Sequence, residues 1–149
     1  ISEAAKAEFK LVTADYLKLK NALVADAFSE AKTGAKEMRG KLEKVKASEL
    51  NEDAGIVWKS YKEQLMLNSE KIAAATNIAE MRNAFDELSN TMIGMVRSFQ
   101  LSSGGLYVMH CPMANNDRGA DWLSASSEVQ NPYYGAAMLK CGEVTETIN

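Results

Sequence analysis

Residues 78–99 read IAEMRNAFDELSNTMIGMVRSF, and this stretch decides the fold because its apolar residues recur at alternating spacings of three and four. That rhythm places the apolar residues on one face of an α-helix, where they form a continuous stripe. The stripe consists of Ile78, Met81, Phe85, Leu88, Met92, Met95 and Phe99. A helix of this kind has to bury its stripe, so the rest of the chain must supply partner helices.

Three upstream segments repeat the same rhythm. Their stripes are Ala5, Phe9, Val12, Tyr16, Leu19 and Leu23; Phe28, Ala31, Ala35, Met38, Leu42 and Val45; and Trp58, Tyr61, Leu65 and Ile72. Polar breaks near 48–53 and 76–77 separate the segments, and Asp26 is a candidate N-cap of the second helix. Short connections between striped helices favour antiparallel neighbours, so we predict a mainly α fold, an up-down-up-down four-helix bundle over residues 3–100.

The pattern changes after Ser102-Ser103-Gly104-Gly105, and five of the nine glycines lie in this last part of the chain. Two short apolar runs, 106–109 and 144–148, predict strands that pair, with a loop and one helical turn at 136–140 between them. We therefore expect a small C-terminal β-containing appendage over 104–149. A length of 149 residues fits a single domain spanning 1–149.

Composition narrows the classes of partner. The chain is 46% hydrophobic and 25% charged, with a net charge of -3, so it offers no electrostatic attraction to nucleic acid or to an anionic membrane. No apolar run approaches the ~20 residues that span a bilayer. Because the chain begins at Ile1, we expect that a signal peptide, a lipoprotein leader or a further domain was removed upstream.

The appendage concentrates the chemistry, because it holds both cysteines and the only histidine. A proline directly after Cys111 favours extended backbone, so Cys111 and Met113 should project to one side and His110 to the other. Met138 and Cys141, three residues apart, share a face if their segment is helical. Thiolates with thioethers form a ligand set that selects Cu(I). The candidate metal ligands are Cys111, Met113, Met138 and Cys141, with His110 as a weaker candidate.

Other interpretations of these residues remain open. Methionines commonly fill gaps in a core, and Cys111 with Cys141 would form a structural disulfide in an exported protein. Cys111, Cys141 and His110 are also a candidate zinc site. In the disulfide interpretation, an aromatic surface near Trp122 and Tyr133 would dock a partner.

Signatures of catalysis and of organic cofactors are missing from the sequence. It has no glycine-rich phosphate loop, no Cys-x-x-Cys and no His-Glu-x-x-His. His110 and Cys111 are adjacent in an extended segment and would face opposite ways, which does not suit a nucleophile and its base. A haem would need a histidine on a helix or a Cys-x-x-Cys-His site, and the sequence has neither. We expect a protein that is not an enzyme and has no organic cofactor.

Four motifs of the appendage carry a resemblance to a known family. They are CPMA at 111–114, GADWLS at 119–124, NPYYG at 131–135 and MLKCG at 138–142. In this order they resemble the signature of a bacterial domain family of unassigned function. Members of that family occur as exported proteins and as C-terminal extensions of the periplasmic adaptor subunits of CusB-type copper and silver efflux pumps. Residues 16–24, YLKLKNALV, also resemble the first helix of the family.

The resemblance implies heavy-metal handling and an exported protein of the periplasm or cell envelope, including attachment as a lipoprotein. Cys111, Met113, Met138 and Cys141 match the motifs, whereas His110 does not belong to the pattern. We therefore expect a non-catalytic protein that binds Cu(I) or Ag(I), with Zn(II) as a further candidate, and sequesters the ion or hands it to heavy-metal efflux components. The alternative is a structural or interaction module with a Cys111–Cys141 disulfide and no metal.

Overall fold

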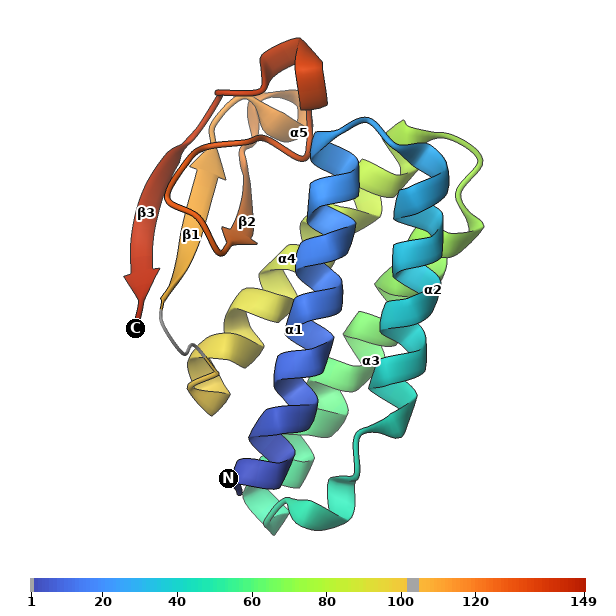
Figure 1. Cartoon of the computed structure of the whole chain (residues 1–149), viewed down its shortest axis with the longest axis vertical. Coiled ribbons are helices and arrows are strands. Elements are labelled where there is room, and N and C mark those ends of the chain that lie inside the picture. The colour runs from blue at the N-terminus through green and yellow to red at the C-terminus, as the bar shows by residue number, and fades with distance from the viewer. Residues whose placement is uncertain (1, 102–104) are drawn as a thin grey trace.

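The computed structural model describes residues 2–101 and 105–149, and it shows the predicted four-helix bundle with a small sheet beside it (Figure 1). The helices α1 (Glu3–Val24), α2 (Phe28–Lys44), α3 (Glu52–Ala74) and α4 (Ile78–Phe99) pack as antiparallel neighbours in chain order. A 3₁₀ turn, η1 (Ala47–Glu49), lies between α2 and α3. The expected break at 102–104, including the predicted first residue of the appendage, lies outside the described residues. No helix in the described part of the chain has the length and apolar composition needed to cross a membrane.

The predicted apolar stripes form the core of the bundle. Nearly all of their members are buried, and only Phe28, Tyr61 and Ile78 are half-buried. Asn68 interrupts the third stripe and is also buried, where its side-chain amide donates to the carbonyl oxygen of Gln64 at 3.0 Å. The helices are therefore held together by the faces that the sequence predicted, as expected for an amphipathic bundle.

A series of aromatic rings continues from the bundle core into the appendage. Tyr16 stacks on Phe85 with ring centroids 5.3 Å apart, Phe85 contacts Tyr133 at 5.6 Å, and Tyr133 contacts Trp122 at 6.0 Å. All four side chains are buried. The appendage and the bundle thus share one continuous core.

Side-chain caps define the starts of α3 and α4. The side-chain oxygens of Asn51 and Asn77 accept hydrogen bonds from backbone N–H groups in the first turn of each helix. The predicted cap of α2 was wrong: its N-cap is Ala27, with no side-chain hydrogen bond. Asp26 instead adopts a left-handed conformation, with φ 55°, and its carboxylate is engaged by α4 and by the appendage.

The appendage is a three-stranded antiparallel sheet. Strands β1 (Leu106–Cys111), β2 (Ala120–Ser124) and β3 (Glu143–Ile148) lie in the order β2-β1-β3, and β2 packs against α4. The predicted pairing of β1 with β3 is confirmed. β2 was not predicted, because five residues within a glycine- and asparagine-rich segment give too short an alternation to be recognised.

Two short helical elements connect the strands of this sheet. They are α5 (Ala114–Asp117) and a 3₁₀ turn, η2 (Gly135–Met138). The predicted helical turn corresponds to η2, which begins one residue earlier than expected and is shorter. In Figure 1, η2 lies above the α1–α2 connection, so the appendage reaches over the end of the bundle.

We expect Phe85→Ala to lower the free energy of unfolding by about 3–5 kcal/mol, because it removes a fully buried ring that contacts both Tyr16 and Tyr133. Urea denaturation followed by circular dichroism measures the change. Leu67→Ala is the control, since Leu67 is 48% exposed on α3 and its truncation should change the free energy by only about 0.5 kcal/mol. Equal effects of the two substitutions would contradict the shared core.

Candidate functional site

Strand pairing brings the two cysteines together at one end of the sheet. Cys111 is the last residue of β1, and Cys141 lies two residues before β3. Since His110 pairs with Glu143, one further step of the antiparallel register places Cys111 opposite Gly142, next to Cys141. The sheet topology therefore places side by side two residues that are thirty positions apart in the sequence.

Gly142 lets the Cys141 thiol reach this position. Residues one step out of register point to opposite faces of a regular sheet, so an ideal strand would hold the two thiols apart. Gly142 has φ 142°, and a Cβ on it would lie 2.9 Å from the Trp122 ring and 3.1 Å from the His110 carbonyl oxygen. The backbone thus breaks the alternation at a residue that only glycine fits well.

Strand pairing places Cys111 and Cys141 side by side, and both thiols are free. Cys111 is fully buried, whereas Cys141 is half-buried. The pKa of the Cys141 thiol is raised above its ordinary value of 9.0, first by the side-chain hydrogen bond with Cys111, then by burial and by the charge of Cys111. A hydrogen bond from the Met113 backbone N–H acts in the opposite direction. The Cys111–Cys141 pair is therefore a compact dithiol with one side accessible.

Both candidate methionines meet Cys141 through their backbones. The Met113 N–H acts on the Cys141 thiol by lowering its pKa, and the Cys141 N–H donates to the carbonyl oxygen of Met138 at 3.1 Å. The Met113 side chain is 44% exposed in the turn after β1, while Met138 is half-buried at the end of η2. The structure thus places the other three predicted sulfur residues near Cys141.

His110 does not join this group. It lies on the opposite face of β1 from Cys111, as the alternation predicted, and its Nδ1 lies 2.6 Å from the Asp121 carboxylate on the neighbouring strand. The imidazole is therefore kept away from the Cys111 thiol. Across residues 2–101 and 105–149, no group of three or more His, Cys, Asp or Glu side chains is placed to hold a metal ion.

Asn131 builds the loop that carries Cys141, a role that the sequence analysis missed. Its side-chain oxygen accepts from the N–H groups of Tyr133 and Tyr134 at 2.7 and 3.1 Å, and its side-chain amide donates to the Cys141 carbonyl oxygen at 2.8 Å. Asn131 is fully buried. The Tyr134 hydroxyl also donates to the Met113 carbonyl oxygen at 2.5 Å, which joins the two sides of the site. An asparagine before proline signals a turn, but these long-range contacts leave no signal in the sequence.

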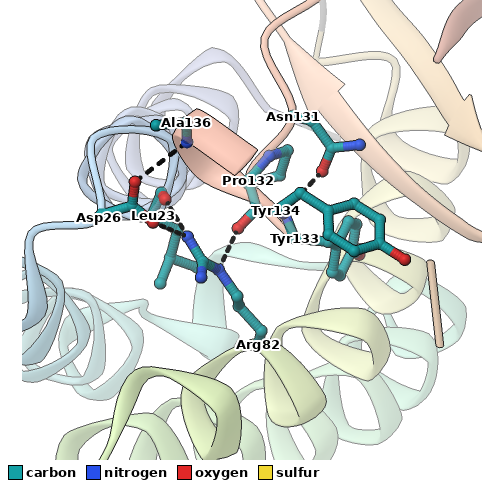
Figure 2. A network of polar contacts seen from close by, with 8 residues as sticks. All are labelled: Leu23, Asp26, Arg82, Asn131, Pro132, Tyr133, Tyr134 and Ala136. Atoms are coloured by element: carbon teal, nitrogen blue, oxygen red, sulfur yellow. Dashed lines mark hydrogen bonds and ion pairs between the residues drawn. The ribbon is translucent and has the colours of Figure 1, made fainter. Parts of the chain in front are cut away.

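Arg82 of α4 ties this loop to the bundle (Figure 2). Its Nε donates to the Pro132 carbonyl oxygen, and one terminal nitrogen donates to the Leu23 carbonyl oxygen and the Asp26 carboxylate, each at 2.7 Å. Asp26 in turn accepts the Ala136 N–H at 3.0 Å. We call this set of contacts the Arg82 hub. It requires glycine at 135, because a Cβ there would lie 2.2 Å from an oxygen of Asp26.

Most of α5, which follows Met113, is a left-handed turn. Asn115, Asn116 and Asp117 have φ of 56°, 56° and 65°, a conformation that asparagine and aspartate tolerate better than other residues with a side chain. The Asn115 side chain donates to the Asp86 carboxylate of α4 at 2.6 Å, and burial raises the pKa of that carboxyl. α4 therefore holds both loops that border the dithiol.

The two aromatic residues that were candidates for a docking surface are buried in the appendage. Trp122 is fully buried and Tyr133 is 8% exposed. They form the wall of the appendage core, so the aromatic docking surface expected under the disulfide interpretation does not lie there.

Comparison with known proteins identifies a family for the bundle. The model of a family described as "Protein of unknown function (DUF3347)" matches residues 12–104. The matched range covers most of α1 and all of α2, α3 and α4, and it ends before the dithiol and the four motifs of the appendage. No curated protein and no solved structure matches the chain.

We expect Asp26→Asn to lower the free energy of unfolding by about 1 kcal/mol at pH 7. The Ala136 N–H, and then Arg82, lower the pKa of Asp26 below its ordinary value of 3.8. A lowered carboxyl pKa stabilises the folded state above that ordinary value, and this stabilisation is lost as the pH falls through the folded-state pKa. The difference in free energy of unfolding between wild type and Asp26→Asn should therefore disappear at acidic pH.

Urea unfolding at a series of pH values between 7 and 3 measures this difference. Glu63→Gln, at an exposed position of α3, is the control for removing one carboxylate. A difference that stays constant with pH would show that the Asp26 charge does not support the Arg82 hub.

Proposed function

Because the chain belongs to the family of unknown function DUF3347, its role has to be inferred from its own residues, and we propose that it binds a soft monovalent metal ion, Cu(I) or Ag(I), at the Cys111–Cys141 pair. The ion would be sequestered or handed on, and the chain would perform no catalysis. One observation carries the proposal: strand pairing places two cysteines with free thiols side by side, and the two candidate methionines lie in the adjoining turns.

The ligand chemistry favours a soft ion. Two thiolates held in contact repel each other, and a cation between them removes that repulsion. Among the described residues, no histidine, aspartate or glutamate joins the two cysteines in a group of three, so further side-chain ligands would be the thioethers of Met113 and Met138. Thiolate and thioether ligands select Cu(I), whereas structural zinc sites use four ligands drawn from cysteine, histidine and carboxylate. A Zn(II) site with His110 is disfavoured because that side chain lies on the opposite face of β1 from Cys111.

The burial of the residues supports a path for the ion. Met113 is 44% exposed, Cys141 is half-buried and Cys111 is fully buried, so accessibility falls from the surface to the deeper thiol. In the proposed mechanism an ion is first bound by Met113 and Cys141 and then by Cys111 as well. Release to a partner runs in the reverse order by ligand exchange.

A place in the cell envelope, and heavy-metal efflux components as the receiving partners, belong to the same proposal. The support for both is the resemblance of the four appendage motifs to domains found with copper and silver efflux adaptors. The match to residues 12–104 supports membership of the family but says nothing of these partners.

The side-by-side placement of the two cysteines also supports the second candidate function, an interaction module with a Cys111–Cys141 disulfide and no metal. Its docking surface would have to be formed by residues other than Trp122 and Tyr133, which are buried. Metal binding by the reduced protein separates the two functions.

We expect reduced protein, titrated anaerobically with Cu(I) against a competing chelator, to bind one ion per chain. Cys111→Ser or Cys141→Ser should weaken binding by more than about 100-fold, since losing a ligand costs more than losing a residue that only supports one. The double variant Met113→Leu with Met138→Leu should weaken it less. Ag(I) should bind similarly and Zn(II) far more weakly.

Two controls sharpen this titration. Met66→Leu removes a thioether from α3, away from the site, and His110→Ala removes the only imidazole; neither should change Cu(I) affinity. Binding no tighter than that of a simple thiol, or binding unchanged by both cysteine substitutions, would refute the proposal and leave the interaction module.

A further inference from the structure

The Cys111–Cys141 pair has a geometry suited to covalent chemistry as well as to metal binding. Residues paired across an antiparallel ladder have Cα atoms about 4.5–5.5 Å apart, and one step along a strand adds about 3.4 Å, so Cys111 and Cys141 are expected roughly 6 Å apart. That separation lies within the range that a disulfide spans without movement of the backbone. Both thiols are free, so each is available to form the bond.

The two cysteines differ in their access to an outside molecule. Cys111 has no exposed surface, whereas Cys141 is half-buried at the edge of the appendage. An external disulfide can therefore reach Cys141 but not Cys111. In thiol–disulfide exchange the accessible thiol reacts first, and a neighbouring thiol then resolves the intermediate.

We propose that Cys141 is a thiol–disulfide exchange site for low-molecular-weight disulfides such as oxidised glutathione, and that Cys111 is its resolving cysteine. In the first step the Cys141 sulfur attacks one sulfur of the external disulfide. The external S–S bond breaks, a mixed disulfide forms on Cys141, and one thiolate leaves with the proton that Cys141 has lost.

In the second step the Cys111 sulfur attacks the Cys141 sulfur of the mixed disulfide. The bond to the external group breaks, the Cys111–Cys141 disulfide forms, and a second thiolate leaves with the proton from Cys111. The protein has then lost two electrons and two protons, and one external disulfide has become two thiols. An excess of external thiol reverses both steps.

The loop around Cys141 is built to hold the thiol in place for this exchange. Asn131 fixes the Cys141 carbonyl at 2.8 Å, and the Tyr134 hydroxyl fixes the Met113 carbonyl at 2.5 Å. The Arg82 hub attaches that loop to α4, so the disulfide can form without rearranging the bundle. One further consequence rests on the proposed function. The disulfide uses both thiolates, so oxidation releases the metal ion and reduction restores its site.

The test uses reduced, metal-free protein mixed with oxidised glutathione and analysed by intact mass spectrometry. Wild type should pass through a transient adduct to a disulfide with no glutathione attached. Cys111→Ser should stop at a stable adduct of one glutathione, and Cys141→Ser should react at least about tenfold more slowly, because its remaining thiol is buried. Adduct formation on Cys141→Ser as fast as on Cys111→Ser would overturn the assigned order, and a wild type that stays reduced would overturn the site.

A second measurement does not depend on the folding of the variants. Wild type is quenched early with an alkylating agent and digested, and the glutathione adduct should be found on the peptide that contains Cys141. An adduct found mainly on Cys111 contradicts the proposal. Because no metal is present, a protein that exchanges disulfides but fails to bind Cu(I) would refute the proposed function alone, and the reverse result would refute only this inference.

Discussion

The Arg82 guanidinium is the contact on which the arrangement of the site depends. It donates to a carbonyl at the end of α1, to the carbonyl of Pro132 and to the carboxylate of Asp26, and its side chain is only 15% exposed. A buried carbonyl without a donor is costly, so one arginine satisfies two chain segments that would otherwise need separate partners. Because Asp26 also receives the Ala136 N–H, the turn between α1 and α2 and the loop leading to Cys141 are held in one fixed relation.

α4 contacts the appendage through polar side chains at three positions along its length. Arg82 holds the loop before η2, Asp86 holds the turn after Met113, and Arg97 pairs with Glu146 of β3. Between these polar contacts, the Phe85 ring joins the bundle core to Tyr133. The bundle therefore acts as a scaffold, and the reactive groups lie on segments that it positions. The family match covers this scaffold, whereas the dithiol lies beyond the matched residues.

Metal binding and disulfide exchange draw on the same physical arrangement. Both need two sulfurs close together, one of them accessible, in a loop that does not have to move. Cys141 meets all three requirements through the Cys111 thiol, its partial exposure and the Asn131 hydrogen bond. Strand pairing brings the two cysteines to one end of the sheet, and Gly142 breaks the side-chain alternation that would point their thiols to opposite faces.

Local periodicity was enough to predict the bundle, the pairing of β1 with β3 and the separation of His110 from Cys111, because helix stripes and strand alternation are properties of neighbouring residues. Residue chemistry alone singled out the two cysteines and two methionines. Only the tertiary structure decided that Asp26 binds Arg82 and Ala136 rather than capping α2, that Asn131 holds Cys141, and that Met113 and Met138 meet the dithiol through their backbones. These contacts join residues as far apart as 26 and 136, and no sequence pattern records which distant polar groups will satisfy one another once the chain has folded.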